Sequence, residues 1–338
     1  MGEKGNKSVV QNSKINPDDG NKFNFIKNDD DVDYNLTINQ IIDEIANGGE
    51  DIVCDWMREI TKYPQTTDAC IMDENVSKNR FQNILLYDNN RVKIKDKNRG
   101  NDYYHASYVD GYDKVGRYVL AQAPFDEYTE SDFWRLVSTA KPNMIVLLAA
   151  TLDDKGVAYI PQFWCTGKKQ KRYFKDLAVR TLEINNLRHW DLYNIEIIDK
   201  QYSKTQTFTL NLIHYRGWTC DNKVPEYILD FRAFFQLRKA ETDVKKFDGP
   251  IMIVCPTGTH RAAFFAAIDI IIDRINQEKR VGIQPTVEII SKQRYGSFIF
   301  FEHYLNLVET ITKHCVSSNI VDLHMLAQVE VKKEKKNV

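Results

Sequence analysis

The sequence lacks several features that would place it in a particular class of proteins. Its formal net charge over 338 residues is −1, so no overall field favours nucleic acid or a membrane surface. It contains no run of about 18 apolar residues, and its first residues have no apolar signal core. Its six cysteines form no Cys-x-x-Cys pair and no zinc spacing. We therefore expect a cytoplasmic protein with reduced thiols and with no membrane span, nucleic-acid partner, metal or cofactor.

The composition, 43% hydrophobic and 28% charged, is typical of a globular protein. Residues 1–33 are rich in Asn, Asp, Lys and Gly, which predicts a disordered N-terminal segment. Residues 34–325 contain no repeat or low-complexity linker and are expected to form one domain, followed by a polar, lysine-rich tail at 326–338. Apolar residues at helical spacing over 37–62 predict one or two helices that pack on this domain.

One segment has the pattern of a phosphate-binding loop. Residues 251–255 are apolar and β-branched, as in a buried strand, and residues 262–272 are apolar at helical spacing. Between them lie Cys255, Gly258 and Arg261. A short loop that opens a helix points backbone N–H groups at an anion, and arginine adds paired hydrogen bonds to phosphate oxygens. The same groups favour a cysteine thiolate, so the pattern indicates a thiol phosphatase. The alternative is a buried structural cysteine before a helix-opening glycine.

Further blocks of sequence follow in the order found in classical protein-tyrosine phosphatases. These blocks are residues 78–81, 83–88, 101–112, 118–124, 132–134, 144–148, 162–164 and 214–225. The chain from about Thr37 to Glu309 thus resembles that family. The resemblance implies a single α/β domain, in which a twisted mixed sheet is flanked by helices and the cysteine loop follows a central strand.

The resemblance also implies a two-step mechanism. Cys255 takes the place of the nucleophile that attacks phosphorus, Arg261 that of the arginine that stabilises the transition state, and Asp221 that of the general acid. Water then hydrolyses the phospho-cysteine. The residues expected to bind the substrate are Phe81, Asn83, Pro256, Thr257, Gly258, Thr259 and His260.

The loop that holds the expected acid departs from the family pattern. Counting back from Val224 and Pro225 places Asp221 in register, whereas counting forward from Trp218 places Cys220 there. The loop therefore has one extra residue, and it lacks the proline that precedes the acid in the family. A general acid must come within about 3 Å of the leaving oxygen. The alternative for Asp221 is a turn-forming Asp-Asn pair.

Other departures weaken the expected catalysis. Val254 stands in place of a histidine before the nucleophile, Ala262 in place of a hydroxyl that bonds the sulfur, and His260 in place of a glycine. Asp154 falls where the family has a glutamate that positions the arginine, and Tyr159 where it has a lysine.

The last block has changed most. Gln293 and Arg294 match the family, but Ser291 stands at its first arginine. Ile299 and His303 stand where the family has the glutamines that orient the hydrolytic water. Loss of one positioned donor commonly costs about 10²–10³ in rate.

Two functions stay open from these residues. One is a phosphotyrosine-binding pseudophosphatase, a monomer whose partners are phosphotyrosine proteins. The other is a weak but active protein-tyrosine phosphatase that uses the Cys255 thiolate and a phospho-cysteine intermediate. A scaffold with a collapsed pocket is the third alternative. The degraded motifs also resemble tyrosine phosphatase-like proteins of polydnaviruses (bracoviruses), which implies action on signalling in the cytoplasm of a host cell.

Overall fold

The computed structural model describes residues 65–95, 101–153, 155–168, 170–201, 205–219, 223–244, 248–278 and 280–321, together with Asp51, Cys54, Asp55 and Arg58. The segments 1–33 and 326–338, predicted to be a disordered start and a polar tail, lie outside the described residues. So do all but four residues of the helices predicted over 37–62.

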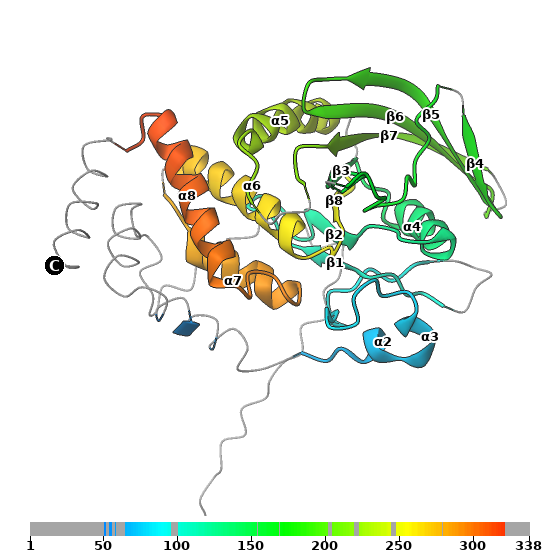
Figure 1. The fold of residues 1–338 in the computed structure, drawn as a ribbon, viewed down its shortest axis with the longest axis horizontal. Helices are drawn as coiled ribbons and strands as arrows, with labels where there is room; N and C mark the ends of the chain where they lie inside the picture. Colours follow the sequence, from blue (N-terminus) through cyan, green and yellow to red (C-terminus); the bar gives the residue numbers. More distant parts are fainter. Residues whose placement is uncertain are drawn as a thin grey trace, which may run out of the picture.

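A mixed sheet of eight strands runs through the described part of the chain (Figure 1). In chain order the strands are β1 (Ala106–Val109), β2 (Tyr118–Gln122), β3 (Met144–Leu148), β4 (Lys171–Phe174), β5 (Leu177–Asn186), β6 (Trp190–Asp199), β7 (Gln206–Tyr215) and β8 (Ile251–Cys255). Their order in the sheet is β1-β2-β8-β3-β7-β6-β5-β4. The four central strands, β2, β8, β3 and β7, are parallel, and antiparallel strands flank them on both sides. The predicted α/β fold with a twisted mixed sheet is confirmed.

Helices cover both faces of this sheet (Figure 1). The covering helices are α4 (Glu127–Ala140) on one face and α5 (Ile228–Val244), α6 (His260–Glu278), α7 (Ile283–Gln293) and α8 (Phe301–Ser317) on the other. Two short helices, α2 (Asp68–Ile71) and α3 (Asp73–Val76), lie apart from these faces. Local sequence sets the bounds of α4: the Asp126 side chain accepts from the Thr129 backbone, a capping box, and Lys141 ends the helix in the left-handed conformation.

The central strand β8 is buried on both faces, which explains its unbroken apolar sequence. Ile251, Ile253 and Cys255 belong to the core shared with α5, α6, α7 and α8. Met252 and Val254 belong to the core on the other face, which includes the apolar side chains of α4. The expected position of the cysteine loop, at the carboxyl end of a central strand, is confirmed, and the Cys255 side chain lies on the α6 face.

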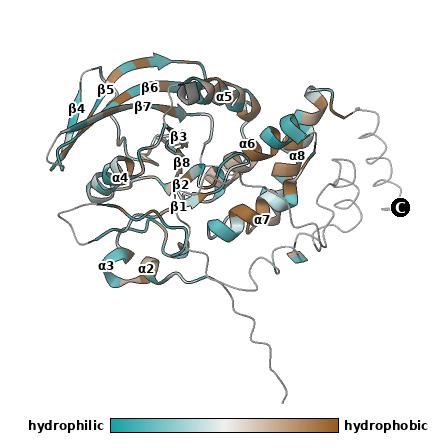
Figure 2. Ribbon diagram, turned by 180° about the vertical axis from the view of Figure 1, so that it is seen from behind, coloured by the Kyte–Doolittle hydropathy of each residue, from teal (hydrophilic) through white to brown (hydrophobic). Residues whose placement is uncertain are grey.

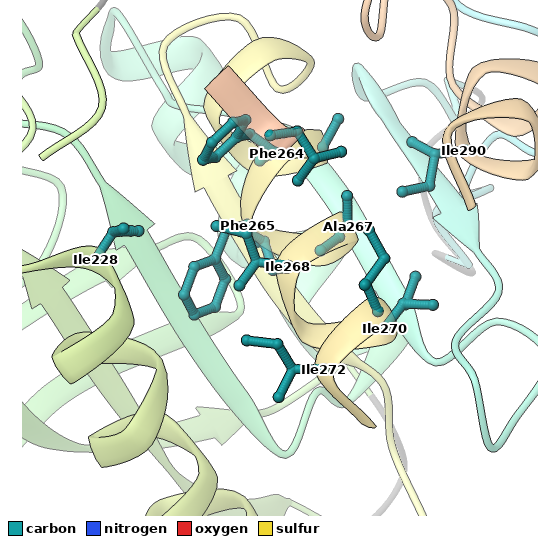
Figure 3. Packing of buried hydrophobic residues seen from close by; sticks show 14 of the residues in the cluster. Ile228, Phe264, Phe265, Ala267, Ile268, Ile270, Ile272 and Ile290 are labelled. Carbon is teal, nitrogen blue, oxygen red and sulfur yellow. The ribbon is translucent and has the colours of Figure 1, made fainter. Parts of the chain in front are cut away.

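Helix α6 is held in the centre of its layer. Hydrophobic colour covers much of α6, α7 and α8 (Figure 2). Phe264, Phe265, Ile268 and Ile272 of α6 are at most 4% exposed and pack in one cluster with neighbours such as Ile228 (Figure 3). Burial of each such side chain stabilises the fold by roughly 1.5–3 kcal/mol. The helix that follows the cysteine loop is therefore a rigid support.

Candidate phosphate-binding site

The loop between β8 and α6, where the sequence predicts an anion cradle, turns tightly against β2. Cys255 ends β8 and α6 begins at His260. Gly258 between them has a φ of +67°, and a Cβ there would lie 2.4 Å from the Gln122 nitrogen and 2.5 Å from the Ala121 carbonyl carbon. Only glycine fits this conformation so close to the backbone of β2.

Cys255 is fully buried at the base of this loop. Its carbonyl oxygen accepts from the N–H of Ala123 at 2.8 Å and from that of Gly258 at 3.1 Å, which fixes the start of the loop. Its sulfur lies 3.6 Å from the Thr257 hydroxyl. Ala262, one turn into α6, is fully buried and offers a methyl group where the family resemblance places a hydroxyl.

Arg261 lies between the cysteine loop and the residues that follow β7. Its guanidinium donates to the carbonyl oxygens of Thr219 at 2.7 Å and Trp218 at 3.5 Å. The rings of Tyr159 and Trp218 each have their centroid 5.7 Å from Arg261 Cζ. Two aromatic rings and two carbonyls thus hold this cation in place.

A second cation, Arg80, also lies against Tyr159. Its Cζ is 5.5 Å from the Tyr159 ring centroid and 5.6 Å from that of Phe81, and its Nη2 donates to the Tyr159 carbonyl at 2.6 Å. Burial lowers the pKa of Arg80. Phe81 is 36% exposed and Asn83 is exposed in the following turn. Arg80 therefore contacts Phe81 and Tyr159, and Tyr159 in turn contacts Arg261.

A buried cation supports the cradle from beneath. Arg294 has no exposed surface, and its Nε donates to the carbonyl of Gly258 at 2.9 Å and its Nη1 to the hydroxyl of Ser107 at 3.1 Å. Its Nη2 bonds His105 Nδ1 at 2.8 Å, and the other ring nitrogen, Nε2, lies 3.0 Å from the Ile84 carbonyl. Since a carbonyl only accepts, His105 is the neutral Nε2–H tautomer, and its Nδ1 accepts from the arginine.

These contacts perturb both groups. Burial and the neighbouring Arg294 lower the pKa of His105 to about 3, and burial lowers the pKa of Arg294 to about 10. At neutral pH His105 is therefore uncharged and Arg294 carries its positive charge. His105 was not among the predicted site residues, because 189 positions separate it from Arg294 in sequence.

Three aromatic rings pack together beside the cysteine loop. One of them, His303, stands at a position where the resemblance places a water-orienting glutamine. The His260 ring lies 4.9 Å from the His303 ring and 5.9 Å from the Phe300 ring, and Phe300 and His303 lie 5.3 Å apart. Burial, then His303 and Arg261, lower the pKa of His260 to about 4. Ile299 is 50% exposed. The His260 side chain therefore packs toward the start of α8.

Some predicted positions cannot be placed. Asp221, Cys220 and Asp154 lie outside the described residues. Pro256, Thr257, Thr259 and His260 lie in the loop as expected. Within the described ranges no three His, Cys, Asp or Glu side chains are grouped to hold a metal, and no helix there is long and apolar enough to cross a membrane.

The comparisons with known proteins agree with this geometry. A family model described as protein-tyrosine phosphatase matches residues 75–313. The chain belongs to the protein-tyrosine phosphatase family. The matched range includes all eight strands of the sheet in the described residues and the loop from Cys255 to Arg261.

Receptor phosphatases are among its relatives. The human receptor-type tyrosine-protein phosphatase zeta is 29% identical over 274 residues, which cover 78% of this chain and 12% of that protein. The Caenorhabditis elegans tyrosine-protein phosphatase Lar-like is 31% identical over 241 residues, or 71% of this chain and 10% of that protein. The Gallus gallus receptor-type tyrosine-protein phosphatase S is 32% identical over 229 residues, which cover 66% of this chain and 14% of that protein. The chain therefore spans only about a tenth of the length of these phosphatases.

Proposed function

We propose that this chain binds phosphotyrosine proteins and turns them over slowly or not at all, as a pseudophosphatase. The observation that supports this most is the contrast between the cysteine loop and the start of α8. Gly258 and Arg261 stand where the resemblance places the phosphate-binding residues, while the His260, Phe300 and His303 rings pack where a water-orienting amide is expected.

In this proposal the loop from Cys255 to Arg261 holds the phosphate group by its backbone N–H groups and the guanidinium. Phe81 packs on the substrate phenol, and Asn83 contacts the segment that carries it. Pro256, Thr257, Thr259 and His260 contribute the rest of the cradle. Asp221 remains the proposed general acid. The proposed partners are phosphotyrosine proteins, and the proposed state is a cytoplasmic monomer.

The second candidate is a weak but active phosphatase. Cys255 and Arg261, the two residues that the first chemical step requires, are both present in the loop. In that case the sulfur attacks phosphorus, the S–P bond forms as the bond to the phenolic oxygen breaks, and Asp221 gives the oxygen its proton. Water later cleaves the S–P bond and releases phosphate. With Ala262 and Ile299 in place, this second step limits the rate.

The relatives named above give no support to a polydnavirus origin. That origin, and action on the signalling of a host cell, stays a hypothesis from the degraded motifs of the sequence alone.

Two assays on the same preparation test the proposal. Tungstate, which mimics phosphate, is expected to raise the melting temperature of the wild-type chain with increasing concentration. Arg261→Lys keeps the charge and loses the paired hydrogen bonds, so it should reduce that rise. In a steady-state assay with a phosphotyrosine peptide, the turnover of the wild type should be little above that of Cys255→Ser. No thermal shift at millimolar tungstate, or turnover at the rate of an ordinary phosphatase, contradicts the proposal.

A further inference from the structure

The side-chain hydroxyl of Thr257 is turned into the cysteine loop. Its oxygen accepts from the backbone N–H groups of Thr259 at 3.2 Å and His260 at 3.4 Å, and from the Thr259 hydroxyl at 3.0 Å. The same oxygen lies 3.6 Å from the Cys255 sulfur. A hydroxyl oxygen thus stands beside the sulfur and takes two of the N–H groups with which a helix opening binds anions.

We propose that Thr257 is an internal competitor of phosphate, whose hydroxyl fills one oxyanion position of the loop and lowers its affinity for phosphate esters. This inference rests on the proposed function, because it concerns the same loop.

The competition follows from the shortage of partners at the start of α6. The first N–H groups of a helix have no acceptor within the helix, so a threonine oxygen or a bound anion satisfies them. One N–H group cannot serve both well. A phosphate oxygen that enters must displace the Thr257 hydroxyl, and the hydrogen bonds that are broken reduce the gain from those that form.

The side chain of Thr257 is able to move while its backbone stays fixed. Its carbonyl oxygen lies 3.4 Å from Arg294 Nη2, and the neighbouring Gly258 carbonyl accepts from Arg294 Nε at 2.9 Å. Thr257 is only partly buried, whereas Cys255, Gly258 and Thr259 around it are buried. Rotation of the hydroxyl out of the loop therefore leaves the cradle itself in place.

The test compares two variants that differ from each other by the hydroxyl alone. Thr257→Ala removes the hydroxyl and empties the position that it fills, and Thr257→Ser is the matched control that keeps it. Titration calorimetry with tungstate measures the affinity, and the melting temperature without ligand measures stability. We expect Thr257→Ala to bind tungstate about tenfold more tightly than the wild type, since two backbone N–H groups become available to the anion. Thr257→Ser should bind as the wild type does.

The two measurements should move in opposite directions. Loss of the hydroxyl removes a cap from α6, so Thr257→Ala should melt at a lower temperature without ligand even though it binds tungstate more tightly. If the hydroxyl had a purely structural role, its loss would lower both the melting temperature and the affinity. If Thr257→Ala does not fold, Thr257→Gly, which also empties the position, replaces it in the same comparison.

Each outcome decides between the two proposals. Binding by Thr257→Ala that equals or falls below that of the wild type overturns the competitor role alone. Absence of tungstate binding in the wild type, Thr257→Ala and Thr257→Ser overturns the proposed function together with this inference.

Discussion

The floor and the rim of the proposed phosphate site are built differently. We call Cys255, Gly258, His105 and Arg294 the floor, and Phe81, Ile299 and Phe300 the rim. The floor residues are buried, and Arg294 bonds both Gly258 and His105. The rim residues are between 36% and 53% exposed.

This difference explains which family features the chain keeps. A change in the floor leaves a buried polar group unpaired or creates a clash, so it costs folding free energy. A change at an exposed rim position costs little stability. Val254 and Ala262 are fully buried departures, but each places an apolar group in an apolar core. Folding therefore constrains the polar floor of the proposed cradle more than it constrains the exposed rim.

The largest expected effect follows from a break in the floor. Gly258→Ala forces a Cβ into the backbone of β2 at a φ of +67°. It should abolish tungstate binding and lower the free energy of unfolding by more than about 3 kcal/mol, as measured by urea denaturation. Phe300→Ala on the rim is the matched control and should change stability by less than about 1 kcal/mol. Equal losses in the two variants would remove the distinction between floor and rim.

Repair of the groups that serve water attack sharpens the comparison. Ala262→Ser with Ile299→Gln should raise kcat on a phosphotyrosine peptide by about 10²-fold, more than either change alone, because each restores a positioned hydrogen-bonding group. His260→Gly is the matching control. It removes the ring that packs against Phe300 and His303, and it restores no hydrogen-bonding group.

If the double variant binds tungstate and stays as slow as the wild type, the loop around Asp221 becomes the cause. Deletion of Thr219 or Cys220 should then bring Asp221 into reach and restore activity. Failure of that deletion argues against Asp221 as the general acid.

A smaller effect concerns pH. His105 faces Arg294, Ser107 and the Ile84 carbonyl, and its pKa in the folded chain, about 3, is below the ordinary 6.5 because of burial and Arg294. Between these values only the unfolded chain binds the proton, so stability falls as pH falls from about 6.5 toward 3. From pH 8 to pH 5 the wild type should lose about 2 kcal/mol more than His105→Asn in urea denaturation. Equal losses would mean that His105 is not held neutral.

The smallest effect concerns the ring between the two arginines. Tyr159→Leu should weaken tungstate binding about 3- to 10-fold because Arg261 loses one of its two aromatic contacts, while Tyr159→Phe keeps the ring and the affinity. Calorimetry on both variants measures this. Weaker binding by both would assign the effect to the hydroxyl instead.

The sequence was sufficient to predict the strand and the helix on either side of the cysteine loop. The β-branched run before Cys255 predicted β8, and the apolar residues at helical spacing after Arg261 predicted α6. Both were predictable because the local pattern of apolar residues indicates which segments are buried. The contact of Arg294 with His105 was not predictable in this way, since it joins distant segments through the fold. Local pattern also did not reveal that Thr257 turns into the loop or that His260 turns toward Phe300, because a side-chain direction depends on its neighbours in space.

The most direct test of the account is rapid mixing of the wild-type chain with an excess of a chromogenic phosphotyrosine analogue. We expect at most one equivalent of phenol per chain in the first phase, followed by slow or no release, because the cradle and the sulfur remain while water attack on the phospho-cysteine is impaired. Linear release from time zero at the rate of an ordinary tyrosine phosphatase would contradict the account.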